Sequence, residues 1–185
     1  MEIEILPFVY RAFLAALLIS VVCGTLGVFV VLRGIAFVGE GLSHAAFAGV
    51  AIALICNLPV TPTTVIFCVI IAYLIRYTSQ KSNLREDSST GIFFSTSMAL
   101  GLLLLSSVKD KNVDVLGYLF GNVLSVGPSD IAYSSLLVLI ILGFVIYFFK
   151  EFSLITFDDD YAEISGIPVE RLTYLLYALL ALTIV

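Results

Sequence analysis

Long apolar runs, separated by short polar or turn-forming stretches, dominate this sequence. A helix needs roughly 20 apolar residues to cross the hydrocarbon core of a bilayer, and the runs approach or reach that length. They predict an all-α fold, namely a polytopic transmembrane helical bundle of about six spans. The predicted spans are 8–32, 36–55, 60–77, 91–108, 131–149 and 172–185.

Composition supports a membrane protein and limits its domain content. Hydrophobic residues make up 61% of the chain and charged residues 12%, far from the balance of an ordinary soluble domain. We expect a single membrane domain over residues 1–185, because the spans leave no room for a separate soluble domain. The last run is still apolar at Val185, so further carboxy-terminal spans are expected to be missing. No basic stripe or aromatic-plus-basic face is present, and nucleic acid is not an expected partner.

Lysine and arginine are distributed unequally between the two sides of the predicted bundle. These residues are enriched on the cytoplasmic flanks of membrane spans. One side has Arg33, Arg76, Lys81, Arg85, Lys150 and Arg171, and the other has Arg11, Lys109 and Lys111. The asymmetry predicts that the first side is cytoplasmic and that the amino terminus lies outside.

The range 113–126 is moderately apolar but too short to cross a bilayer comfortably. With Gly117 and Gly121 inside it, we expect an external surface helix or a re-entrant hairpin. The charged stretch 109–114, which overlaps the start of this range, contains Asp110 and Asp114, which could attract cations. A solvated loop whose charges neutralise one another is the plainer interpretation.

Small residues recur at four-residue spacing in the first two spans. This spacing keeps them on one helix face, where small side chains let neighbouring backbones approach closely. We therefore expect both faces to pack inside the bundle. They are Gly41, Ala45, Gly49 and Ala53 in the second span, and Ala12, Ala16, Ser20 and Gly24 in the first.

Glu40 and His44 are the clearest ionisable residues inside a span, and such residues are costly in lipid. Four residues apart, they share one helix face and are separated by about 6 Å along the axis. Carboxylate and imidazole suit zinc, manganese or ferrous iron, with the remaining ligands coming from a second helix or subunit. Two plainer interpretations stay open: Glu40 snorkels to the interface, and His44 only hydrogen-bonds a neighbouring helix.

A short helix is predicted over 158–165, between the last two spans on the cytoplasmic side. Acidic residues at its start are typical of an amino-terminal cap, and Gly166 followed by Pro168 is typical of a helix end. The acidic residues are Asp158, Asp159 and Asp160. A soluble partner could bind and displace such a helix, or the helix could simply connect the two spans.

The sequence contains no G-x-x-x-x-G-K-[ST] pattern, so it has no P-loop for nucleotide phosphates. If ATP drives this protein, a separate chain binds and hydrolyses it. We therefore do not expect the chain itself to be an enzyme.

Three stretches resemble the permease subunits of bacterial ABC importers for zinc, manganese and iron. Gly24–Arg33 runs into Ala36–Gly49, which is similar to the family's acid-x-x-Ser-His-Ala helix. The other two are 113–126, with its unusual Gly-Tyr-Leu-Phe-Gly-Asn string, and 158–168. The resemblance runs along the whole chain in order.

This resemblance implies a type II ABC importer permease in the inner (plasma) membrane. Glu40 and His44 would line the translocation path and contact a divalent metal, the transported substrate rather than a resident cofactor. The helix at 158–165, with Ala162 and Gly166, would be the coupling helix. Implied partners are a cytoplasmic ATPase subunit, an extracellular metal-binding protein, membrane lipid and a second permease subunit, with a homodimer as the expected form.

Two departures from the family pattern stand out: the family more often has Asp where this chain has Glu40, and its members usually continue beyond Val185. The alternatives are a permease for a siderophore- or cobalamin-like ligand, and an ATP-independent secondary cation transporter or channel. One nitrogen and one oxygen donor leave the choice between zinc, manganese and iron open.

Overall fold

The structure, a computed structural model, describes residues 7–82, 84–106 and 126–185. Within these ranges the regular secondary structure is helical, without strands, and the all-α prediction is confirmed. The surface or re-entrant helix predicted at 113–126 lies outside the described residues except for Val126. The neighbouring charged stretch with Asp110 and Asp114 lies outside them as well.

Most of the helices begin and end close to the limits of the apolar runs. Some helices extend beyond the predicted spans, because a helix does not end where its residues become polar. Helix α3 continues past Tyr77, and α4 begins before Gly91. The described helices are α1 Pro7–Leu32, α2 Ala36–Ile55, α3 Val60–Ser82, α4 Glu86–Ser106, α6 Pro128–Tyr147, α7 Phe149–Phe157, α8 Asp159–Ile164 and α9 Val169–Ile184.

Five of these helices, α1 to α4 and α6, are long and apolar enough to cross a membrane. The sixth predicted span corresponds to α9, which has 16 residues. Helix α7 was not predicted, because its apolar residues are too few to form a span. It buries Phe152 and Ile155 on one side and leaves Phe149 and Phe157 exposed on the other. The chain is therefore a multi-pass membrane bundle with a short helical segment at one end.

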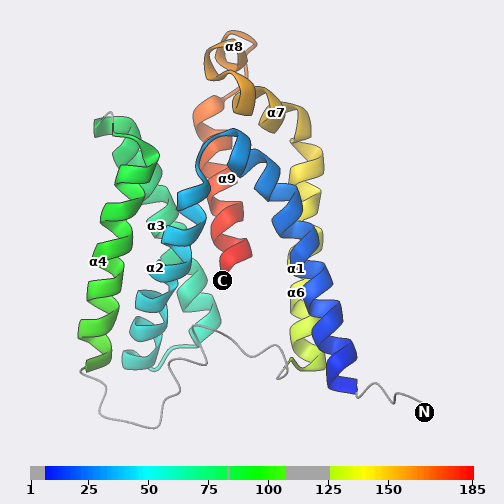
Figure 1. The fold of residues 1–185 in the computed structure, drawn as a ribbon, viewed down its shortest axis with the longest axis vertical. Helices are drawn as coiled ribbons and strands as arrows, with labels where there is room; N and C mark the ends of the chain where they lie inside the picture. Colours follow the sequence, from blue (N-terminus) through cyan, green and yellow to red (C-terminus); the bar gives the residue numbers. More distant parts are fainter. Residues whose placement is uncertain (1–6, 83, 107–125) are drawn as a thin grey trace.

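The helices form two groups (Figure 1). Helix α2 packs against α3 and α4, while α1 runs beside α6. Helix α9 lies between the groups and contacts α1, α2 and α3. The buried core follows this arrangement, with Leu26 from α1, Leu42 from α2, Ile75 from α3, and Leu176 and Tyr177 from α9.

The small residues of α2 lie where its neighbours approach most closely. A Cβ added to Gly41 would overlap Thr90 Cγ2 of α4, and one added to Gly49 would lie 2.9 Å from Thr64 Cα of α3. Ala45 and Ala53 are fully buried on the same helix. Close approach of membrane helices depends on such residues.

The corresponding expectation for α1 is wrong for most of its residues. Ala12 is buried, but Ala16, Ser20 and Gly24 are exposed. The buried face of α1 is instead made up mainly of the larger residues Val22, Leu26 and Phe29, together with Ala15. Small residues permit close packing without requiring it, and this face of α1 has no neighbour among the described helices.

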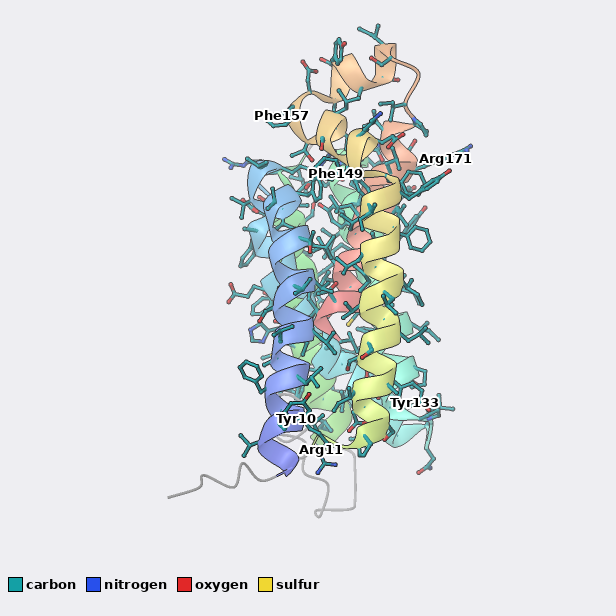
Figure 2. All side chains as sticks on the ribbon, turned by 90° about the vertical axis from the view of Figure 1, so that its right-hand side faces the viewer. Tyr10, Arg11, Tyr133, Phe149, Phe157 and Arg171 are labelled. Carbon is teal, nitrogen blue, oxygen red and sulfur yellow. The ribbon has the colours of Figure 1, made fainter. Side chains whose placement is uncertain are left out.

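Lysine and arginine are distributed unequally between the two ends of the described bundle. Figure 2 shows Arg11 with Tyr10 and Tyr133 at one end, and Arg171 with Phe149 and Phe157 at the other. The α1–α2 corner, the α3–α4 connection, α7 and α8 all lie at the end marked by Arg171. That end therefore holds the side chains that the charge asymmetry groups together: Arg33, Arg76, Lys81, Arg85, Lys150 and Arg171.

Candidate functional site

Glu40 and His44 lie in the first half of α2, toward the end of the bundle that carries Arg171. Glu40 is exposed, as is Ser43, and His44 is partly buried. The Ser43 hydroxyl donates to the Glu40 carbonyl oxygen at 2.8 Å, within the turn that joins the pair. Glu40 thus lies on an exposed part of α2, and His44 lies at the edge of the surface that α2 presents to α4.

The orientation of His44 is set by α4. Its ring meets the ring of Phe94 edge to face, with centroids 4.9 Å apart. On either side of this contact, α2 and α4 are held close by Gly41 against Thr90 and by Gly101 against Phe47. Sequence reasoning missed Phe94, because nothing in the chain order shows which α4 residue faces His44.

The described part of the chain has no group of three or more His, Cys, Asp or Glu side chains that could hold a metal ion. Glu40 and His44 together offer an oxygen and a nitrogen donor, a set suited to divalent transition metals. A metal ion held by this pair would need further ligands from outside the described residues. Within this chain Glu40 is exposed and His44 is partly buried beside Phe94.

Glu40 and His44 line neither of two cavities in the bundle, although Ser43 between them lines the smaller one. The larger, of about 700 Å³, lies between α1, α3, α6 and the end of α9, with Asp130 and Tyr133 in its wall. The smaller, of about 160 Å³, is lined by Ser43, Thr61 and Thr64 among others. The ionisable pair therefore lies outside the walls of both of these cavities.

Helix α8 is closed at both ends by local hydrogen bonds. Asp158 caps its start, since the side-chain Oδ1 accepts from the Tyr161 backbone N–H at 2.9 Å. At its end Gly166 has a φ of +82°, and the Ile167 N–H donates to the Ala162 carbonyl oxygen at 3.1 Å. This is the Schellman arrangement, which glycine favours because L side chains are strained at positive φ.

The acidic residues and Ala162 of this segment play different structural roles. Asp158 is the cap, Asp159 forms an ion pair with Arg33 at 3.1 Å, and Asp160 is exposed. Ala162 is fully buried and belongs to the hydrophobic core. Ala162 therefore anchors α8 to the bundle and does not face a partner.

The outward surface of the segment is formed by apolar residues that sequence reasoning missed. Phe157, Tyr161 and Ile164 are 78%, 59% and 86% exposed. Their spacing was a usable signal, because Tyr161 and Ile164, three residues apart on one helix, share a face. Exposed apolar groups beside acidic side chains are typical of a surface that binds another protein.

A second polar cluster stabilises the same end of the bundle. Arg76 Nη1 of α3 donates to Glu86 Oε1 of α4 at 2.5 Å, and the Tyr177 hydroxyl of α9 donates to Glu86 Oε2 at 2.5 Å. Tyr177 is fully buried, and both charged side chains are mostly buried. The cluster fixes α3, α4 and α9 relative to one another.

Comparison with known proteins gives a consistent result. The model of the ABC 3 transport family matches residues 5–185. A manganese transport system membrane protein from Halalkalibacterium halodurans is 39% identical over 96% of this chain and 61% of its own length. A probable iron transport system membrane protein from Haemophilus influenzae is 32% identical, over 96% of this chain and 65% of its own length.

A similar solved structure is PsaBC from Streptococcus pneumoniae in complex with Fab. It has a TM-score of 0.81 and 32% sequence identity, over 98% of this chain and 65% of that chain. This chain thus spans a little over three fifths of the length of the curated relatives that it matches, for example 61% and 63% for two manganese transport system membrane proteins.

Proposed function

The chain belongs to the ABC 3 transport family, and we propose that it is the membrane permease subunit of an ATP-driven importer of divalent metal ions, namely zinc, manganese or iron. The observation that carries this proposal is the carboxylate and imidazole pair of Glu40 and His44, one helical turn apart on one face of a membrane-spanning helix. The manganese and iron transport relatives support the same substrate class.

The exposed position of Glu40 suits a site completed between two permease subunits. A second subunit that brings its own Glu40 and His44 would double the donor set to two oxygens and two nitrogens. Relative motion of the two subunits would then separate the donors and release the ion. A homodimer follows as the form of the transporter that we propose.

The outward face of α8 is the proposed contact with a cytoplasmic ATPase subunit. Tyr161 and Ile164 would enter a groove of that partner, with Asp160 and Glu163 at the rim. The chain contains no P-loop pattern, which supports a separate ATPase. At the opposite end, an extracellular metal-binding protein would deliver the ion.

The test of this function is uptake into proteoliposomes that contain the chain with its ATPase and metal-binding partners. We expect uptake of Mn²⁺, Zn²⁺ or Fe²⁺ that requires ATP on the side of the membrane where α8 lies. Ile164→Asp is expected to abolish both ATPase binding and uptake, since it places a charge in the apolar contact. Ser165→Asp is the matched control, because Ser165 is exposed and the change removes no apolar side chain.

Uptake driven by an ion gradient without the ATPase would contradict the proposal and favour a secondary transporter. Uptake of a siderophore or cobalamin with no uptake of free metal would also contradict it. Full uptake by Ile164→Asp would exclude the α8 contact while leaving the metal substrate intact.

We propose further that the end carrying α8 is cytoplasmic and that the amino terminus is outside, since arginine and lysine gather at the α8 end. In a variant without native cysteines, Ser129→Cys is expected to react with a membrane-impermeant maleimide on intact cells. Ser165→Cys is expected to react only after permeabilisation. Both serines are exposed, so the reverse pattern would invert the topology.

A further inference from the structure

The side chain of Arg33 connects several segments at the end of the bundle that carries α8. Its Nη1 donates to the Ile155 carbonyl oxygen of α7 at 2.5 Å. Its Nη2 donates to Asp159 Oδ2 of α8 at 3.1 Å and to Thr173 Oγ1 of α9 at 3.0 Å. The guanidinium therefore holds α7, α8 and α9 together, as its planar fork of donors allows.

The Arg33 side chain is only 8% exposed, although Asp159 is half exposed. Thr173 is fully buried, and its hydroxyl donates to the Val169 carbonyl oxygen at 2.9 Å, so its lone pairs are available to accept from Arg33. A buried arginine is stable only when its donors are satisfied. The three acceptors thus keep the guanidinium in a single position.

The backbone of Arg33 is equally constrained. It lies in the short corner between α1 and α2, where Gly34 has a φ of +71°. The Gly34 N–H donates to Val31 and the Ile35 N–H to Val30, which is a Schellman motif at the end of α1. Ile35 is 2% exposed, so the corner is anchored in the core where it leads into α2.

The corner leads directly into the helix with the proposed metal ligands. Helix α2 begins at Ala36, and Glu40 and His44 lie about 6 and 12 Å along it at 1.5 Å per residue. Val38 and Leu42 of this stretch are fully buried, so it is packed into the core. Figure 1 shows the corner beneath α7, beside the start of α9.

From these contacts, and resting on the proposed function, we infer that Arg33 is a positioning residue that transmits displacement of α8 by the ATPase to α2. Asp159 is the receiving group on α8, and the rigid corner carries the displacement to Glu40 and His44. The buried Ala162 packs α8 against the core through apolar contacts, which have no preferred direction. The hydrogen bonds of Arg33, in contrast, have fixed directions. Arg33 would not touch the metal.

The deciding measurement is the number of Mn²⁺ ions taken up per ATP hydrolysed by the full transporter in proteoliposomes. Arg33→Gln is expected to keep ATP hydrolysis within about twofold but to lower the uptake ratio at least about tenfold, in the usual range of coupling between sites. Asp159→Asn should lower the ratio less and should add no further loss to Arg33→Gln, since both remove the same connection.

Glu86→Gln is the matched control. It weakens the other polar cluster at this end, which joins α3, α4 and α9 but not α8. Loss of stability should lower hydrolysis and uptake together in this variant, with an unchanged ratio. If Arg33→Gln fails to assemble, Asp159→Asn decides the question, because Arg33 then keeps its bonds to Ile155 and Thr173.

A second readout follows the proposed site directly. Ser43 is exposed beside His44, and under the proposed function a Ser43→Cys side chain would reach the water-filled path and react there with a water-soluble maleimide, once the exposed Cys23 and Cys56 are replaced. We expect the labelling rate to change on ATP binding in the parent transporter and to stay constant in Arg33→Gln. A change that persists in Arg33→Gln, or an unaltered uptake ratio, would overturn the inference. Absence of ATP-driven uptake in the parent would instead overturn the proposed function, and this inference with it.

Discussion

Replacing His44 or Glu40 with alanine is expected to lower metal uptake at least about 100-fold. Removal of a residue that only hydrogen-bonds a metal ligand already lowers metal affinity or activity about 10–100-fold, and these two residues are the proposed ligands themselves. Each substitution removes one of the two donors that the chain offers on this face of α2. Assembly with the ATPase should be unaffected, because Glu40 is exposed and His44 only partly buried. The measurement is initial uptake of radioactive Mn²⁺, with Zn²⁺ and Fe²⁺ in parallel.

Two further variants make this prediction specific. Glu40→Asp keeps a carboxylate and should retain much of the uptake, whereas Glu40→Gln keeps the size and should not. Ser43→Ala is the matched control, because Ser43 is exposed between the two and its hydroxyl bonds only within its own helical turn. Normal uptake by both alanine variants would show that Glu40 snorkels and that His44 only packs against Phe94.

Gly49→Leu is expected to prevent correct packing of α2 against α3. The first added carbon would lie 2.9 Å from Thr64 Cα and 3.3 Å from Phe67 Cβ, and backbone atoms cannot move aside as a flexible side chain can. Overpacking of a well-packed core costs about 1–3 kcal/mol, and a leucine here forces the helices apart. We expect a clear fall in the thermal unfolding temperature of the detergent-solubilised protein, or no folded protein at all.

Gly39→Leu provides the control on the same helix. A Cβ at Gly39 has no neighbouring atom within 4 Å, so the larger side chain meets open space. Its unfolding temperature should stay close to that of the parent protein. Equal stability of the two leucine variants would show that the close approach of α2 and α3 at Gly49 does not determine packing.

Part of the site could be predicted from local spacing. Glu40 and His44 share a face because residues four apart on a helix always do. Asp158 caps α8, and Gly166 ends it at positive φ, because both effects involve only nearby backbone groups. The shared face of Tyr161 and Ile164 could be predicted from spacing in the same way. Whether that face is exposed depends on how α8 packs on the core.

Other parts of the site depend on residues far apart in the chain. Arg33 meets Ile155, Asp159 and Thr173, which lie more than 100 positions later in the sequence. Nothing near Arg33 distinguishes it from the other basic residues that mark the same end of the bundle. The Phe94 contact of His44 likewise depends on the relative position of two helices.

The sequence by itself determined the membrane-spanning helices and the unequal distribution of lysine and arginine between the two ends, because these follow from how each segment meets lipid and water. Only the tertiary structure decided which helix faces are buried. The small residues of α2 pack closely, whereas Ser20 and Gly24 of α1 are exposed. The physical reason is that lipid is as apolar as a protein core, so hydrophobicity puts a helix into the membrane without choosing the face that meets its neighbours.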